Sequence, residues 1–210
     1  MSSAELSRQI YEQLGPLGLE SRTNEQSDAE TVELVLNQIG RQPRRVLDAG
    51  CGYGRIAIPL AKAGFDVVGI DICPAMLDEA RFRADQERVT IEWLLGDIGE
   101  LPFPDQSFDI VLCLWLTFHE LLQENEQRTA LRAMNRILVP GGLGLLDGPP
   151  FHKQGDDEPI SGFTSPTDDT DEELAVIGFD HWMQQLGIVE FDQFVDDCPG
   201  RPRQFLKWRK

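Results

Sequence analysis

The chain has 210 residues, enough for one domain with a sizeable core but short for two. Hydrophobic residues make up 41% of it and charged residues 26%, as in ordinary soluble globular proteins. The formal net charge of −17 argues against a nucleic acid or an anionic membrane surface as partner, because both need clustered Lys and Arg. Neutral or cationic small molecules and basic protein surfaces suit such a charge.

The four cysteines show neither CxxC nor Cys/His ligand spacing, so the sequence predicts no metal site and no disulfide framework. The N-terminus lacks the basic and apolar segments of a signal peptide, and no run reaches the ~18 apolar residues of a membrane span. We therefore expect a cytoplasmic protein. The sequence does not indicate its oligomeric state.

We expect one domain over residues 1–210, opening with a helical cap at 1–43. Within this cap, a first helix precedes Gly15-Pro16, a loop follows at 20–27, and a second helix covers about 28–39.

From Arg45 onward, predicted strands and helices alternate, which is typical of a mostly parallel sheet with helices on both faces. The expected strands are 45–49, 67–71, 89–95, 108–114, 143–147, 188–195 and 203–209, and the expected helices start at Pro74 and cover 124–138 and 171–186. An acidic loop at 148–169 follows the fifth strand. The last two strands form a hairpin.

Alternating glycines, Gly50, Gly52 and Gly54, end the first expected strand. Glycine tolerates positive φ and lets the backbone pass close to a ligand, so this pattern predicts a turn wrapped around a bound group. A second apolar strand ends in Asp71 and completes the strand–turn–helix–strand unit that binds adenosine-containing cofactors, with the acid on the ribose hydroxyls. Arg55 stands where a dinucleotide site has its third glycine, which disfavours a pyrophosphate ligand.

Residues 46–54, which read VLDAGCGYG, resemble the first motif of class I S-adenosyl-L-methionine-dependent methyltransferases of the small-molecule type. The resemblance covers residues 45–210 and is strongest up to Asp147. It implies an α/β fold, a three-layer αβα Rossmann-like sandwich whose seven-stranded, mostly parallel sheet has one antiparallel strand. S-adenosyl-L-methionine is the cofactor that it implies.

The resemblance also assigns roles to residues at the strand ends. It places Asp48 near the methionine amino group, with the backbone from Gly50 through Cys51 to Gly52 under the amino-acid portion. Asp71 would take both ribose hydroxyls. The apolar neighbours of the adenine ring would be Ile72 and Met76.

Two further segments match the family in the same way. Asp97 would accept a hydrogen bond from the adenine amino group, and the backbone of Ile98 would donate one. Leu114 and Trp115 would lie near the sulfonium and the substrate entrance. Because these residues follow consecutive strands, the carboxyl edge of a parallel sheet brings them together.

His119 is the candidate catalytic residue, since imidazole titrates near neutral pH and could orient the acceptor or take its proton. A packed histidine without a chemical role is the alternative. The acidic loop at 148–169 could close over the site as a lid, or be ordinary solvated surface.

The leading interpretation is an enzyme that moves the cofactor's methyl group onto a small-molecule acceptor by in-line displacement. The alternative is a non-catalytic S-adenosylmethionine-binding protein that regulates or recruits a basic partner. A pocket lined by Trp115, Phe118, His119 and Phe163 would favour the enzyme. A nicotinamide oxidoreductase is disfavoured by Asp48 and Arg55.

Overall fold

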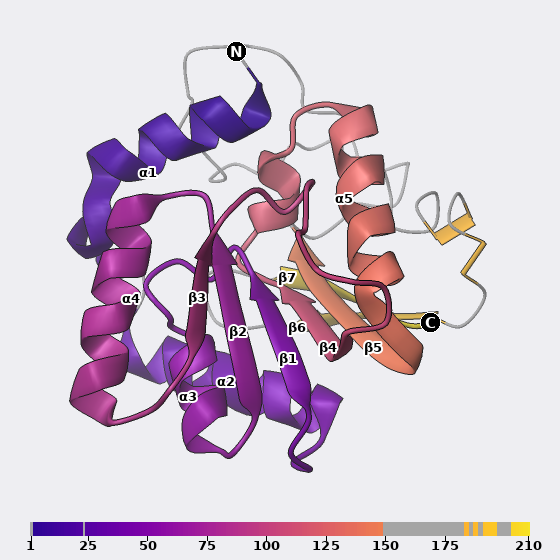
Figure 1. Ribbon diagram of the computed structural model, residues 1–210, viewed down its shortest axis with the longest axis horizontal. Coiled ribbons are helices and arrows are strands. Elements are labelled where there is room, and N and C mark those ends of the chain that lie inside the picture. Colours follow the sequence, from indigo (N-terminus) through magenta and orange to yellow (C-terminus); the bar gives the residue numbers. More distant parts are fainter. Residues whose placement is uncertain (1, 23, 149–182, 185–186, 189–190, 197–202) are drawn as a thin grey trace.

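The computed structural model describes residues 2–22, 24–148, 183–184, 187–188, 191–196 and 203–210. Its elements are α1 (Ser3–Glu20), α2 (Glu25–Ile39), β1 (Arg45–Ala49), α3 (Ala57–Lys62), β2 (Asp66–Asp71), α4 (Pro74–Glu87), β3 (Glu92–Leu95), β4 (Phe108–Cys113), the 3₁₀ helix η1 (Thr117–Glu120), α5 (Glu124–Ile137), β5 (Leu138–Gly148), β6 (Phe191–Asp196) and β7 (Arg203–Arg209). Two helices come first, and strands and helices then alternate from β1 to β3 (Figure 1).

The strands form one seven-stranded sheet in the order β3-β2-β1-β4-β5-β7-β6. Neighbouring strands from β3 to β5 pair in parallel, whereas β7 runs antiparallel to both β5 and β6. The expected sheet, mostly parallel with one antiparallel strand, is therefore confirmed within the described residues. Because β1 to β4 are parallel, their carboxyl ends meet at one edge, below α1 in Figure 1.

Helices cover both faces of the sheet, so the expected three layers are confirmed. Successive strand residues alternate between the two faces, as Val46 and Leu47 of β1 do. Leu47 shares its core cluster with the apolar side of α5, and Val46 shares its cluster with α2, α3 and α4. None of the helices in the described part of the chain combines the length and apolarity that a membrane crossing requires.

The boundary of β5 differs from the prediction, which began this strand at residue 143. The strand starts at Leu138 and includes the Pro140–Gly142 segment that reads as a turn. The reason is pairing with the C-terminus, since Gly141 N donates to Lys210 O at 2.8 Å and Lys210 N donates to Gly142 O at 3.0 Å. Gly148 belongs to this strand, so the expected acidic loop loses its first residue, and the rest of it lies outside the described residues.

β3 starts at Glu92 rather than at residue 89, because the chain at Arg88 and Val89 still forms the C-terminal cap of α4. Arg88 adopts a left-handed conformation after α4, and Val89 N donates to Ala84 O at 3.1 Å. The second helix starts at Glu25 rather than near residue 28, since the Asn24 side chain caps it by accepting from Ser27 N at 2.9 Å.

The N-terminal cap contains the two helices that the sequence predicts, with one addition. α1 kinks at Gly15, whose φ is +66°, and then continues to Glu20, which was expected in a loop. Glu20 forms a bidentate ion pair with Arg83 of α4 at 2.9 and 3.0 Å. This pair holds the second half of α1 against α4, beside the carboxyl edge of the sheet.

A close approach in the sheet gives a test of this packing. A Cβ added to Gly144 of β5 would lie 2.1 Å from Trp208 Cζ2 on β7, directly across the strand pair. We expect Gly144→Ala to lower the free energy of unfolding by about 2–3 kcal/mol in chemical denaturation, through overpacking. In a Trp208→Phe background the same change should cost clearly less, because the fused ring carbons are gone. Equal costs in both backgrounds would contradict this packing.

Candidate cofactor and acceptor site

The turn after β1 is tied to the end of β2 by backbone hydrogen bonds. Gly50 N and Cys51 N both donate to Ile70 O, at 2.8 and 3.0 Å. Gly50 and Gly52 have φ values of +80° and +52°, which L side chains adopt rarely. A Cβ on Gly52 would meet only Leu19 Cδ2, at 3.7 Å, so this backbone leaves open space at the site.

Asp71 stands at the carboxyl end of β2 and binds two turns at once. Its carboxylate accepts from Gly52 N at 2.8 Å and from Cys73 N at 2.9 Å. Burial raises the pKa of this carboxyl group, while the backbone donors lower it. Carboxylate oxygens have further lone pairs, so Asp71 can also accept from a ligand.

Asp48 is a buried carboxylate with an unsatisfied atom. The residue is 3% exposed, and its Oδ2 has no hydrogen-bond partner. Burial raises the pKa of Asp48 to about 7, with Arg55 opposing and Asp71 adding to the shift. Buried polar atoms are rarely left unpaired, so this oxygen marks a place for a donor from outside the chain.

A cavity connects these groups, and all ten residues that the sequence predicts at the cofactor line it: Asp48, Gly50, Cys51, Gly52, Asp71, Ile72, Met76, Asp97, Ile98 and Leu114. They follow β1, β2, β3 and β4, as the strand-end argument requires. Their contact with a cofactor stays a prediction. Further residues of the lining come from α1 and from the segment after β4, where Trp115 was expected.

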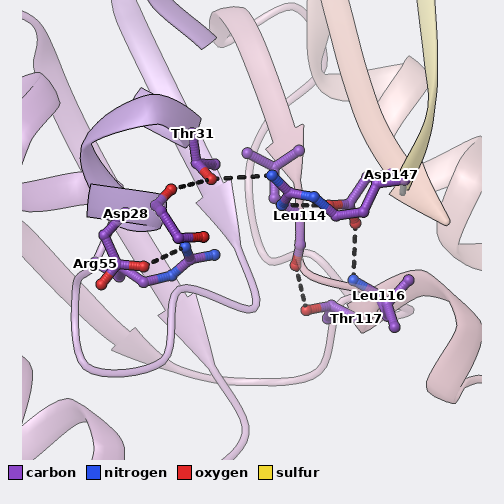
Figure 2. A network of polar contacts seen from close by, with 9 residues as sticks. Asp28, Thr31, Arg55, Leu114, Leu116, Thr117 and Asp147 are labelled. Atoms are coloured by element: carbon purple, nitrogen blue, oxygen red, sulfur yellow. Dashed lines mark hydrogen bonds and ion pairs between the residues drawn. The ribbon is translucent and has the colours of Figure 1, made fainter. Parts of the chain in front are cut away.

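The segment after β4 is held in a strained conformation by a buried ion pair, shown in Figure 2. Trp115 and Leu116 both have positive φ, at 62° and 68°. Leu116 N donates to Asp147 Oδ1 at 2.7 Å, and the other oxygen of Asp147 contacts Arg203 Nη1 at 3.2 Å. Arg203 Nη2 in turn donates to Thr31 Oγ1 of α2 at 2.9 Å. The fully buried Asp147 therefore fixes where the segment enters the cavity.

Arg55 is a cation in the lining. It pairs with Asp28 of α2 at 2.8 Å, and its guanidinium lies 4.2 Å from the centre of the Trp115 ring. Trp115 itself lines the cavity, as expected. The stacked guanidinium thus supports the indole from the side of α2.

α1 closes the other side of the cavity. Ala4, Ser7, Tyr11 and Leu19 line it, together with Glu120 of η1. The Tyr11 hydroxyl donates a short hydrogen bond to Glu120 Oε1. The sequence makes Tyr11 only a weaker candidate for contact with the cofactor carboxylate, with packing as the favoured alternative, and it gives Glu120 no role of its own. Sequence reasoning therefore missed this pair.

His119 and Phe118 are placed differently from the expectation. Neither is among the residues that line the cavity. Phe118 packs into the core and is 1% exposed, while the His119 ring lies over Gly148. Burial lowers the pKa of His119 to about 4. A catalytic role for His119 stays a prediction, and Phe163 and the acidic loop lie outside the described residues.

Comparisons with known proteins agree with this geometry. Residues 46–142 match the family described as "Methyltransferase domain". The chain is 40% identical over 115 residues to the demethylmenaquinone methyltransferase of Deinococcus radiodurans, covering 53% of this chain and 46% of that protein. The chain spans about half the length of the curated relatives it matches.

Solved structures show the same fold along the whole chain. The magnesium protoporphyrin IX methyltransferase of Synechocystis PCC 6803, solved with bound S-adenosylmethionine, has a TM-score of 0.69 at 18% identity, covering 100% of this chain and 98% of that one. The cyclase SpnF has a TM-score of 0.76 at 19% identity, covering 100% and 97%. At these identities the likeness shows the fold alone.

A glycine turn between β1 and α3, acids at three strand ends and a seven-stranded sheet define a class I methyltransferase domain. Residues 46–142 thus carry the methyltransferase domain, and the match to curated methyltransferases agrees with the class I S-adenosylmethionine-dependent family that residues 46–54 indicated.

The raised pKa of Asp48 predicts that this carboxyl group destabilises the ligand-free protein when it is ionised. The folded state holds this proton more tightly than the unfolded chain, so the contribution to stability is full below about pH 4 and is lost as pH rises through about 7. We expect Asp48→Asn to raise the unfolding free energy of the ligand-free protein at pH 8 by on the order of 2 kcal/mol, since one pKa unit is worth ~1.4 kcal/mol and relaxation offsets part. The gain should vanish at pH 4; a gain of equal size at both pH values would refute the assignment.

The lowered pKa of His119 predicts the opposite dependence of the unfolding free energy on pH. The unfolded chain binds this proton near pH 6.5 and the folded state only near 4, so stability is lost as pH falls between these values. Between pH 7 and 5, wild-type protein should lose about 2 kcal/mol more than His119→Gln, from a shift of ~1.4 kcal/mol per unit. Denaturation curves at both pH values measure the difference, and parallel losses would show that His119 is not buried in its neutral form.

Proposed function

We propose that this protein transfers the methyl group of S-adenosylmethionine to a small-molecule acceptor. The observation that carries the proposal is the buried carboxylate of Asp48, whose Oδ2 lacks a partner at the mouth of the glycine turn. An ammonium group donates to a carboxylate and compensates its charge. The amino group of the cofactor's methionine part is such a donor.

The other strand-end residues suit the remaining parts of the cofactor. Asp71, whose carboxylate is oriented by two backbone amides, would bind the ribose hydroxyls. Asp97 after β3 would bind the adenine amino group, with Ile72, Met76 and Ile98 around the ring. In this proposal adenine lies at β3, ribose at β2 and methionine at β1, in the order of the neighbouring strands.

The cofactor's sulfonium supplies the activated methyl group, and the residues of the chain would position the two reactants and exclude water from them. α1 and the segment after β4 both contribute to the lining, so they would exclude water from the transfer and hold the acceptor in line. Leu114 and Trp115 lie at the end of β4, next to the methionine side of the site.

A small acceptor fits the size and charge of the site better than a macromolecule. The relatives named above act on demethylmenaquinone and on magnesium protoporphyrin IX, which are small molecules by their names. The net charge of −17 disfavours a nucleic acid, and anionic membrane surfaces are disfavoured for the same reason.

A non-catalytic cofactor-binding protein is the second candidate, since fold alone does not establish methyl transfer, as the cyclase with this fold illustrates. The lining favours the enzyme. Trp115, Thr117 and Glu120 extend the cavity beyond the residues that the cofactor would occupy, which leaves groups for an acceptor.

Asp71 provides the direct test of cofactor binding. Asp71→Ala removes the carboxylate expected to accept two hydrogen bonds from ribose, so the affinity for S-adenosylmethionine in calorimetric titration should fall by roughly 2–4 kcal/mol. Asp78→Ala, which removes an exposed carboxylate on α4 outside the cavity, should bind like the wild type. Wild-type affinity in Asp71→Ala would sink the site assignment.

The same titration tests the nicotinamide interpretation, because NADH should not displace S-adenosylmethionine from the protein. The acceptor is found by incubating the purified protein with methyl-labelled cofactor and fractionated metabolite pools. Binding without transfer to any pool would favour the non-catalytic candidate.

A further inference from the structure

Glu120 carries a partly buried carboxylate that lines the cavity. The proposed contacts of the cofactor do not use this carboxylate. Three other acids of the lining, Asp48, Asp71 and Asp97, stand at the ends of β1, β2 and β3, where they suit the ammonium, ribose and adenine. Glu120 lies on η1, which follows β4. Since β4 pairs with β1 on the side away from β2, this carboxylate enters from the methionine side of the site.

Hydroxyl groups of α1 hold this carboxylate in place. Tyr11 donates to Glu120 Oε1, and the Ser7 hydroxyl is a further partner. All three residues line the cavity. A carboxylate that accepts from two hydroxyls keeps a fixed direction and has lone pairs left for a third donor.

We propose that Glu120, oriented by Tyr11, takes the proton from the methyl acceptor, and that the acceptor is therefore a protic nucleophile, a hydroxyl or an amine. This inference rests on the proposed function. The acceptor's oxygen or nitrogen forms the new bond to the methyl carbon, the carbon–sulfur bond breaks with its electron pair left on sulfur, and the acceptor's proton passes to a carboxylate oxygen of Glu120.

The surroundings of Glu120 suit a base. Burial raises its pKa above the usual range of glutamate, which brings it closer to working pH and makes it a stronger proton acceptor. Asp71 raises this pKa further, while hydrogen bonds from Tyr11 and Ser7 and the charge of Arg22 lower it. The neighbouring residue His119, the candidate base from the sequence, does not line the cavity.

A structural role is the competing explanation, and Glu126 allows the two to be separated. Glu126 of α5 accepts from the Ser3 hydroxyl and also links α1 to the segment after β4, yet it does not line the cavity. If Glu120 only holds α1 in place, Glu120→Gln and Glu126→Gln should behave alike.

The experiment compares the binding of two cofactor analogues by calorimetry. Sinefungin carries an ammonium in place of the transferred methyl group, and S-adenosylhomocysteine carries nothing there. Glu120→Gln should weaken sinefungin about tenfold, the size of one hydrogen bond to a charged group, and leave S-adenosylhomocysteine within about twofold. Glu126→Gln should bind both like the wild type. Glu120→Asp keeps the charge but is one methylene shorter, so its affinity for sinefungin should lie between those of the wild type and Glu120→Gln. This variant replaces Glu120→Gln in the comparison if the latter is unstable.

Equal losses for both analogues in Glu120→Gln, or no loss for either, would overturn the inference, because the carboxylate would then not face the transferred group. Wild-type protein that binds neither analogue would overturn the proposed function and this inference with it. With an acceptor from the screen, the rise of kcat/KM with pH through the pKa of Glu120 should be lost in Glu120→Gln and kept in Glu126→Gln.

Discussion

The site depends on the attachment of the glycine turn to the end of β2. Two amides of the turn donate to Ile70 O, and a third, Gly52 N, donates to the Asp71 carboxylate. Asp71 also accepts from Cys73 N at the start of α4, so one side chain connects both turns. The backbone that would carry the methionine part and the acid that would carry the ribose are thereby placed by the same hydrogen bonds. A loss of either would misplace both.

Such an arrangement concentrates negative charge where water is scarce. Burial and the charge of Asp71 raise the pKa of Asp48 and oppose its ionisation, and Arg55 offsets only part of this because Asp28 already pairs with it. A ligand with an ammonium and a sulfonium supplies the missing positive charge. The same groups that destabilise the empty protein would thus favour a cationic cofactor over an anionic dinucleotide, which is the usual relation between strain and function at binding sites.

The cofactor half of the site could be predicted because its residues follow consecutive parallel strands, and a sheet brings such ends together. The acceptor half could not. Tyr11 and Glu120 are 109 positions apart and meet only through the docking of α1. Neighbouring residues of a 3₁₀ helix point about 120° apart, so the sequence could not decide whether His119 or Glu120 faces inward. The start of β5 was missed because pairing with Lys210 overrides the turn preference of Pro140–Gly142.

The family match covers the residues proposed for the cofactor but only part of those proposed for the acceptor. Residues 46–142 contain the turn and the acids of β1 to β3, whereas α1, Asp147 and Arg203 lie outside this range. Asp147, paired with Arg203, nonetheless holds the strained segment after β4 through Leu116 (Figure 2). From α1, Tyr11 lines the cavity. Parts outside the matched range therefore contribute to the side proposed for the acceptor, together with Trp115 and Glu120 inside the range. A protein of this kind can keep one cofactor site and change its acceptor through α1, which lines the cavity, and through the Asp147–Arg203 pair, which positions the segment after β4. Neither part makes the hydrogen bonds that hold the glycine turn.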